Sequence, residues 1–262
     1  MSPWWIVVFG AIFFIGVTKS GFGSGVGLMI VPMALLAMTH MGYAPQATLG
    51  LMLPLLVTGD VLAVWQYRKR FSPRLILRLL PGSLAGVIAG WALLSWFNSQ
   101  NKTVAIALVE LEVGIESVGL VSLHWWRTRH GKLQALARPT WPRSSLTGLL
   151  AGASSTLAHA AGPIIALYLL PQKLDRAVFV GTSANYFFLL NLAKLPAYWR
   201  SHDMNRSTLL LSARTVPLVI FGALFGLWLN RRINDKAFSK IIYFVTFLLG
   251  WYLLFLGGRA LV

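Results

Sequence analysis

Long blocks of apolar residues, separated by short polar connections, follow one another along the whole chain. Runs of this length and continuity predict helices that enter or cross a bilayer, because membrane strands would alternate in polarity and measure roughly ten residues. The sequence therefore predicts an all-α polytopic membrane protein. The apolar runs cover about residues 4–18, 26–38, 47–66, 79–97, 104–126, 146–157, 163–171, 177–198, 208–229 and 238–257.

Two glycine-rich interruptions lie at matching places in the two halves of the chain, at residues 19–27 and 158–163. A break in an apolar segment is tolerated only where other protein or a water-filled cavity satisfies the freed backbone groups. Each half is then interpreted as a broken helical hairpin followed by three membrane spans. This pattern predicts two inverted-topology repeats in a single membrane domain, and the hairpins could be re-entrant or fully spanning. The repeats cover 1–130 and 144–262, with a basic linker at 127–143.

Charge and composition decide the class of protein. The chain is 56% hydrophobic and 11% charged, which suits an integral membrane protein better than a nucleic-acid-binding one, despite a net charge of +16. Most basic residues gather in the connections at 68–78, 127–143, 173–176 and 231–240. Returning hairpins put all four connections on one face, which the positive-inside tendency makes cytoplasmic. The predicted location is the inner membrane, with both termini on the opposite face.

Composition also excludes several kinds of site. The chain has no cysteine, so it has neither a disulfide framework nor a thiolate metal site. No metal-ligand motif stands out, and no metal or other cofactor is expected. The first apolar block lacks a basic leader and a small-residue cleavage site, and it is interpreted as mature structure.

The two interruptions are the candidate anion site. A helix that begins at a hairpin tip has unpaired amides and partial positive charge, and glycine lets a ligand approach that backbone closely. Close helix packing by the glycines, snorkelling of the two lysines and a tip-bracing role for the histidine are the competing interpretations. The predicted substrate-binding residues are Lys19, Gly21, Phe22, Gly23, Ser24, Gly25, His159, Ala160, Ala161, Gly162, Asn191 and Lys194.

Four carboxylates lie inside predicted spans. Helical geometry puts Glu112 and Glu116 on nearly one face, with Glu110 about 120° away from Glu116. In the protonated form, Asp60, Glu112 and Glu116 could couple transport to proton movement. In the ionised form, they would pair with Lys19, Lys194 or loop arginines. Structural pairing is the default interpretation for the three glutamates, and both roles stay open for Asp60.

At the interruptions and their neighbours, the chain resembles the TauE/SafE family of permeases, also called the sulfite exporter or toluene-sulfonate uptake permease family. The resemblance covers nearly the whole chain and implies transport of sulfur-containing oxyanions without covalent chemistry. It rests on Lys19-Ser20-Gly21-Phe22-Gly23-Ser24-Gly25, Val31-Pro32, Ala158-His159-Ala160-Ala161-Gly162-Pro163, Tyr168-Leu169-Leu170-Pro171-Gln172, Phe179-Val180-Gly181-Thr182 and Asn191 to Lys194.

The chain departs from that family pattern at three places that bear on substrate choice. Ser24 and Val26 stand in a stretch that is often more uniformly glycine. Ala160-Ala161 would narrow the space above the second tip, and the cluster at Glu110, Glu112 and Glu116 is unusual for an apolar span.

The functional hypothesis is a secondary transporter that moves sulfite or organosulfonates by alternating access. Its expected partners are a small anionic substrate and the lipid bilayer, and a homo-oligomer stays open. An anion channel is the first alternative. An intramembrane hydrolase is the second, because Ser154 or Ser155 and His159 are spaced for one helical face and resemble a nucleophile and its base.

Overall fold

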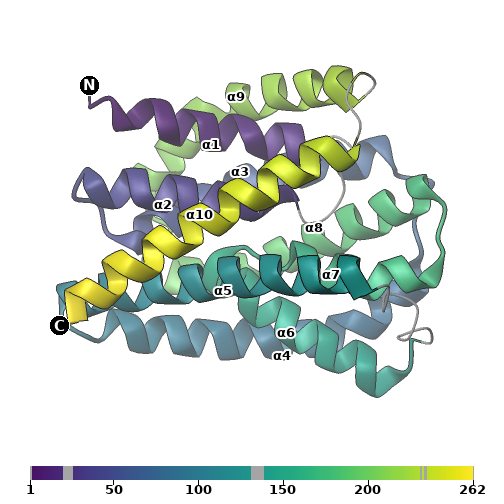
Figure 1. The fold of residues 1–262 in the computed structure, drawn as a ribbon, viewed down its shortest axis with the longest axis horizontal. Helices are drawn as coiled ribbons and strands as arrows, with labels where there is room; N and C mark the ends of the chain where they lie inside the picture. Colours follow the sequence, from purple (N-terminus) through teal and green to yellow (C-terminus); the bar gives the residue numbers. More distant parts are fainter. Residues whose placement is uncertain (1, 20–25, 131–138, 231, 233–234, 262) are drawn as a thin grey trace.

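The protein is a bundle of α-helices, which confirms the all-α prediction (Figure 1). The computed structural model describes residues 2–19, 26–130, 139–230, 232 and 235–261, and these contain no strand. The helices are α1 (Trp4–Lys19), η1 (Val26–Met29), α2 (Ile30–His40), α3 (Pro45–Gln66), α4 (Pro73–Asn98), α5 (Lys102–His130), α6 (Trp141–Ala158), α7 (Gly162–Leu169), η3 (Leu170–Gln172), α8 (Arg176–Arg200), α9 (Arg206–Asn230) and α10 (Asp235–Leu261).

Four of the described helices are long and apolar enough to cross a membrane: α3, α4, most of α9 and most of α10. The protein is therefore a multi-pass membrane protein. α5 and α8 are equally long, but polar residues within them lower their hydropathy. These are Glu110, Glu112 and Glu116 in α5, and Asn191 and Lys194 in α8. In a membrane, such residues face the interior of a bundle, so α5 and α8 bring polar groups inside, as α3 does with Asp60.

Close backbone contacts hold the helices in pairs. α4 lies against α6, and α1 lies against α9 (Figure 1). A Cβ atom added at Gly152 of α6 would lie 2.2 Å from the carbonyl oxygen of Ser83, and one added at Gly16 of α1 would lie 2.0 Å from that of Val219. Only glycine fits at these crossings. Such contacts are typical of membrane helices, whose association depends on close packing of small residues.

The two ends of the bundle are built in corresponding ways. At one end, the loop after α8 rests on α3, and a Cβ at Gly50 would lie 1.8 Å from the carbonyl oxygen of Asp203. At the other end, the loop after α3 rests on α8, and a Cβ at Gly181 would lie 1.9 Å from that of Arg70. Both termini lie on the same side of the bundle (Figure 1). This is the side of the Asp203 loop.

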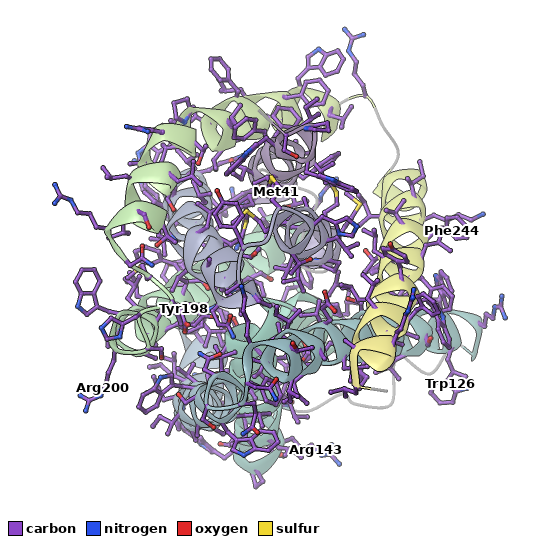
Figure 2. All side chains as sticks on the ribbon, turned by 90° about the vertical axis from the view of Figure 1, so that its left-hand side faces the viewer. Met41, Trp126, Arg143, Tyr198, Arg200 and Phe244 are labelled. Carbon is purple, nitrogen blue, oxygen red and sulfur yellow. The ribbon has the colours of Figure 1, made fainter. Side chains whose placement is uncertain are left out.

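The outer surface is apolar, as a bilayer requires. Figure 2 shows Trp126 and Phe244 directed outward, whereas Tyr198 lies within the bundle. Tryptophans near helix ends, such as Trp65 and Trp199, are exposed. Their positions suit the membrane interface, where amphipathic aromatic rings accumulate.

The glycine contacts generate a prediction about stability. Gly152→Ala forces a methyl group against the α4 backbone, so we expect a loss of about 1–3 kcal/mol of stability from overpacking. The measurement is thermal unfolding in detergent, followed by tryptophan fluorescence. Gly119→Ala in α5 is the matched control, because nothing lies within 4 Å of a Cβ there. Equal unfolding temperatures for the two variants would contradict the proposed backbone contact.

Candidate functional site

A cavity of about 80 Å³ lies between the ends of α1 and α6 and the inner faces of α3 and α8. Thr18, Lys19, Ser155, His159 and Asn191 supply its polar lining. The rest of the wall is apolar and includes Leu56, Val180, Ala184 and Phe187. The cavity therefore offers hydrogen-bond donors and a cation on one part of its surface, and hydrocarbon on the other.

Asp60 of α3 lies behind this lining, bonded to two of its residues, and its side chain is fully buried. Lys19, the last residue of α1, donates to Oδ1 of Asp60 in a close ion pair. Asn191 of α8 donates from Nδ2 to Oδ2 of the same carboxylate at 2.6 Å. The ammonium group of Lys19 also lies 4.9 Å from the centre of the Phe187 ring. One carboxylate thus joins three helices beside the cavity.

Local sequence explains how Lys19 reaches this position. α1 ends at Lys19, so its side chain can extend along α3. The residue before Asp60 is Gly59, where an added Cβ would lie 3.2 Å from Cγ of Lys19. A side chain at position 59 would press on the lysine stem.

A second lysine, Lys194, is fully buried and contacts Ser155 and His159 of the polar lining. Nζ of Lys194 lies 2.9 Å from the carbonyl oxygen of Ser155, 2.9 Å from Oγ of Ser155 and 2.8 Å from Nδ1 of His159. Lys194 is 0% exposed. Both residues that it contacts, Ser155 and His159, line the cavity.

His159 ends α6 in the left-handed conformation, with φ of 52°. This sharp turn directs its ring toward α3, where Nε2 lies 3.2 Å from the carbonyl oxygen of Leu49. A carbonyl can only accept a hydrogen bond, so Nε2 carries the proton. Nδ1 is then free to accept from Lys194. These two contacts assign a neutral imidazole to His159.

The two helix ends lie at different depths along α3. His159 contacts Leu49, and Lys19 contacts Asp60, eleven residues further on (49 to 60). At 1.5 Å per residue this separation is about 16 Å. The cavity extends between these two helix ends.

The remaining predicted binding residues divide into three groups. Ala160 and Gly162 line the cavity. Ala161 is buried in the apolar cluster around Ile165 and does not line it. The amide of Ala160 donates to the carbonyl of Ser154 at 3.4 Å, so this amide is already engaged. Gly21, Phe22, Gly23, Ser24 and Gly25 lie outside the described residues.

Sequence reasoning missed the role of Ser155 as a lysine partner and of Phe187 as part of the wall. Phe187, Asn191, Lys194 and Tyr198 follow one another at intervals of four, three and four residues. That spacing places them on one face of a helix. This spacing was the sequence feature from which the position of Phe187 beside Asn191 and Lys194 could have been predicted.

The glutamates of α5 lie outside the cavity lining. Ser154 donates from Oγ to Oε2 of Glu116 at 3.0 Å. Oε1 of Glu112 is buried and has no hydrogen-bond partner among the described residues. Neither carboxyl group is among the partners of Lys19, which pairs with Asp60, or of Lys194, which contacts Ser155 and His159.

The hydrogen bonds of the two serines bear on the hydrolase hypothesis. The hydroxyl of Ser154 is directed to Glu116, and that of Ser155 contacts Lys194. The imidazole of His159 contacts Lys194 and a backbone carbonyl. The described residues also contain no group of three metal-ligating side chains.

A comparison with known protein families matches residues 8–253 to the family described as Sulfite exporter TauE/SafE. The chain belongs to the TauE/SafE family. The resemblance predicted from the sequence is confirmed, and because this is a family of membrane transporters, the protein is a transporter and not an enzyme. The family description indicates a sulfur-containing anion as the transported species. Comparisons with curated proteins and with solved structures gave no match.

A separate polar cluster lies at the end of the bundle where the loop after α8 covers α3. Asp203 in this loop is 4% exposed. Asn98 of α4 donates to its Oδ1 at 3.4 Å, and Gln46 of α3 donates to Asn98. Burial raises the pKa of Asp203 to about 7, while the hydrogen bonds from Asn98 and Ser201 act in the opposite direction.

This pKa predicts a pH dependence of stability. The pKa of Asp203 rises from an ordinary value of 3.8 to about 7 on folding. Its protonated form therefore stabilises the fold at low pH, and this contribution is lost as the pH rises through about 7. We expect the unfolding temperature to fall as the pH rises from about 4 to about 7, between the unfolded and folded pKa values, and to level off above that. Asp203→Asn should reduce that fall, and an unchanged profile would contradict the buried carboxyl.

Proposed function

We propose that the protein is a secondary transporter that moves small sulfur oxyanions, such as sulfite or organosulfonates, across the inner membrane. The observation that carries this proposal is the cavity between two helix ends, where Lys19, Asn191, Ser155 and His159 meet an apolar wall. An oxyanion needs donors around its oxygens, and the apolar wall suits a short carbon chain. The basic connections at the end opposite the termini support a cytoplasmic assignment of that face.

The electrostatic balance of the site favours an anion. Two lysines and one carboxylate surround the cavity, and the carboxylate is already bonded to Lys19 and Asn191. A positive charge on Lys194 has no carboxylate of its own among the described residues. Anion binding would compensate that charge in an environment where an unpaired charge is costly.

Two inverted repeats, 1–130 and 144–262, are the architecture we infer for this transporter. The pairing of α1 with α9 corresponds to the pairing of α6 with α4 when the halves are exchanged. Gly50 and Gly181 make corresponding loop contacts and stand 131 residues apart (181 minus 50). Asp60 and Asn191 show the same separation and bond to each other. Their bond would lie on the pseudo-two-fold axis, which is where an alternating-access site belongs.

Transport should be tested by counterflow in proteoliposomes, with sulfite, sulfoacetate, thiosulfate and sulfate offered in parallel. A transporter with alternating access gives saturable counterflow, whereas an anion channel does not. Transport of none of the sulfur anions would contradict the proposed cargo.

Lys19→Ala should weaken the binding of the transported anion by about tenfold or more, because one charged hydrogen bond contributes about 1.5–3 kcal/mol. The measurement is the half-saturating concentration for counterflow. Lys69→Ala, in the exposed loop after α3, is the control and should behave like the parent.

The single variant also leaves Asp60 without its cation. The double variant Lys19→Ala, Asp60→Asn removes both charges and should fold while still binding weakly. Parent-like affinity in the double variant would remove Lys19 from the binding site.

A further inference from the structure

Lys194 is a buried cation position without a counter-ion of its own. The ionisable groups that face it are Lys19 from α1, Asp60 from α3, and His159 at the end of α6. Tyr198 lies one turn further along α8, and its charged neighbours are Glu112 of α5 and Asp203. Between residues 79 and 98, α4 contributes no ionisable side chain. Both oxygens of Asp60 are bonded elsewhere, to Lys19 and Asn191.

The three contacts of Lys194 suit both of its protonation states. A charged ammonium group donates three hydrogen bonds, and the carbonyl of Ser155, the hydroxyl oxygen of Ser155 and Nδ1 of His159 are three acceptors. A neutral amine donates two and accepts one. The carbonyl and Nδ1 can only accept, so in this state the Ser155 hydroxyl must donate to the amine.

The hydroxyl of Ser155 is therefore the group that changes role. With neutral Lys194, its hydrogen is directed at the amine. With charged Lys194, it accepts from the ammonium group, and its hydrogen is released for another acceptor. Ser155 lines the cavity, whereas Lys194 does not. The released hydrogen can turn toward an anion in that cavity.

Given the proposed function, we propose that Lys194 binds a proton and so couples the transport of the anion to the movement of a proton. A proton from water binds Lys194 as an anion enters the cavity, and the freed Ser155 hydroxyl donates to that anion. One monoanion and one proton then cross together without net charge. The proton leaves Lys194 when the anion dissociates on the other side.

The charge balance explains why the two bind together. An ammonium group at Lys194 with an empty cavity adds an unpaired charge beside Lys19, in a buried environment that disfavours it. An anion in the cavity with a neutral Lys194 lacks both the compensating charge and the Ser155 donor. Each ligand therefore increases the affinity for the other, as linkage between two binding equilibria requires.

Methanesulfonate is a suitable probe because it stays ionised at neutral pH and brings no proton of its own, whereas sulfite titrates. Its binding to the full-length protein in detergent can be measured calorimetrically at pH 7 in buffers with different ionisation enthalpies. The dependence of the observed heat on the buffer counts the protons taken up. We expect about one proton per anion bound in the parent protein.

Lys194→Arg provides the decisive variant, because arginine keeps its proton. It should bind methanesulfonate with no proton uptake. Lys102→Arg, at the exposed start of α5, is the matched control and should retain the parent proton count. Parent-like proton uptake by Lys194→Arg would overturn the assignment to this residue.

The hydroxyl switch has its own test, which also serves if the arginine variant does not fold. Ser155→Ala should weaken methanesulfonate binding about tenfold, and Ser155→Thr, which keeps a hydroxyl, should restore it. Unchanged affinity in Ser155→Ala would overturn the switch. In the parent, anion binding without proton uptake would overturn proton coupling and leave the proposed function standing, whereas absence of binding by any sulfur anion would overturn the proposed function itself.

Discussion

Asp60 is the residue on which the interior of this bundle depends. Its carboxylate is buried and is held by an ion pair from α1 and an amide from α8. Removing one partner of a buried ion pair usually costs about 3–5 kcal/mol, because the other charge stays behind without compensation. The Asp60 contacts therefore fix the end of α1 against α3 and α8. The position of one wall of the cavity follows from this constraint.

Backbone packing supplies the rigidity that these polar contacts need. α1 packs along α9 and α6 packs along α4, and glycine contacts bring each pair close together. Side chains are largely absent at these crossings, so the helix axes approach closely and fix the rotation of α1 and α6. That rotation directs Lys19 and Ser155 toward the same cavity. Glycines remote from the substrate thus position the residues that would contact it.

The sequence predicted the helices well, and also the interruption between Ala158 and Gly162, because hydropathy and glycine runs are local properties. It also identified Lys19, His159, Asn191 and Lys194 as polar residues in apolar surroundings. The pairing of Lys19 with Asp60 was one of the predicted alternatives, but the partners of His159 and Lys194 were not predictable. Pairing depends on the depth and rotation of each helix, which follow from packing between distant segments. The left-handed turn at His159 illustrates this, because it directs the ring to a backbone carbonyl of α3, an acceptor that no side-chain pattern reveals.

The structure also relates charge to the kind of anion the site could select under the proposed function. With Lys19 neutralised by Asp60 and His159 neutral, the site has one remaining position for a positive charge, at Lys194. A monoanion would balance that charge, whereas a dianion would leave a negative charge in a buried environment, where uncompensated charge is costly. The apolar wall around Phe187 adds a second criterion, since it can contact a hydrocarbon group but offers nothing to a further oxygen. Charge number and one apolar substituent would together distinguish a sulfonate from sulfate more strongly than size alone.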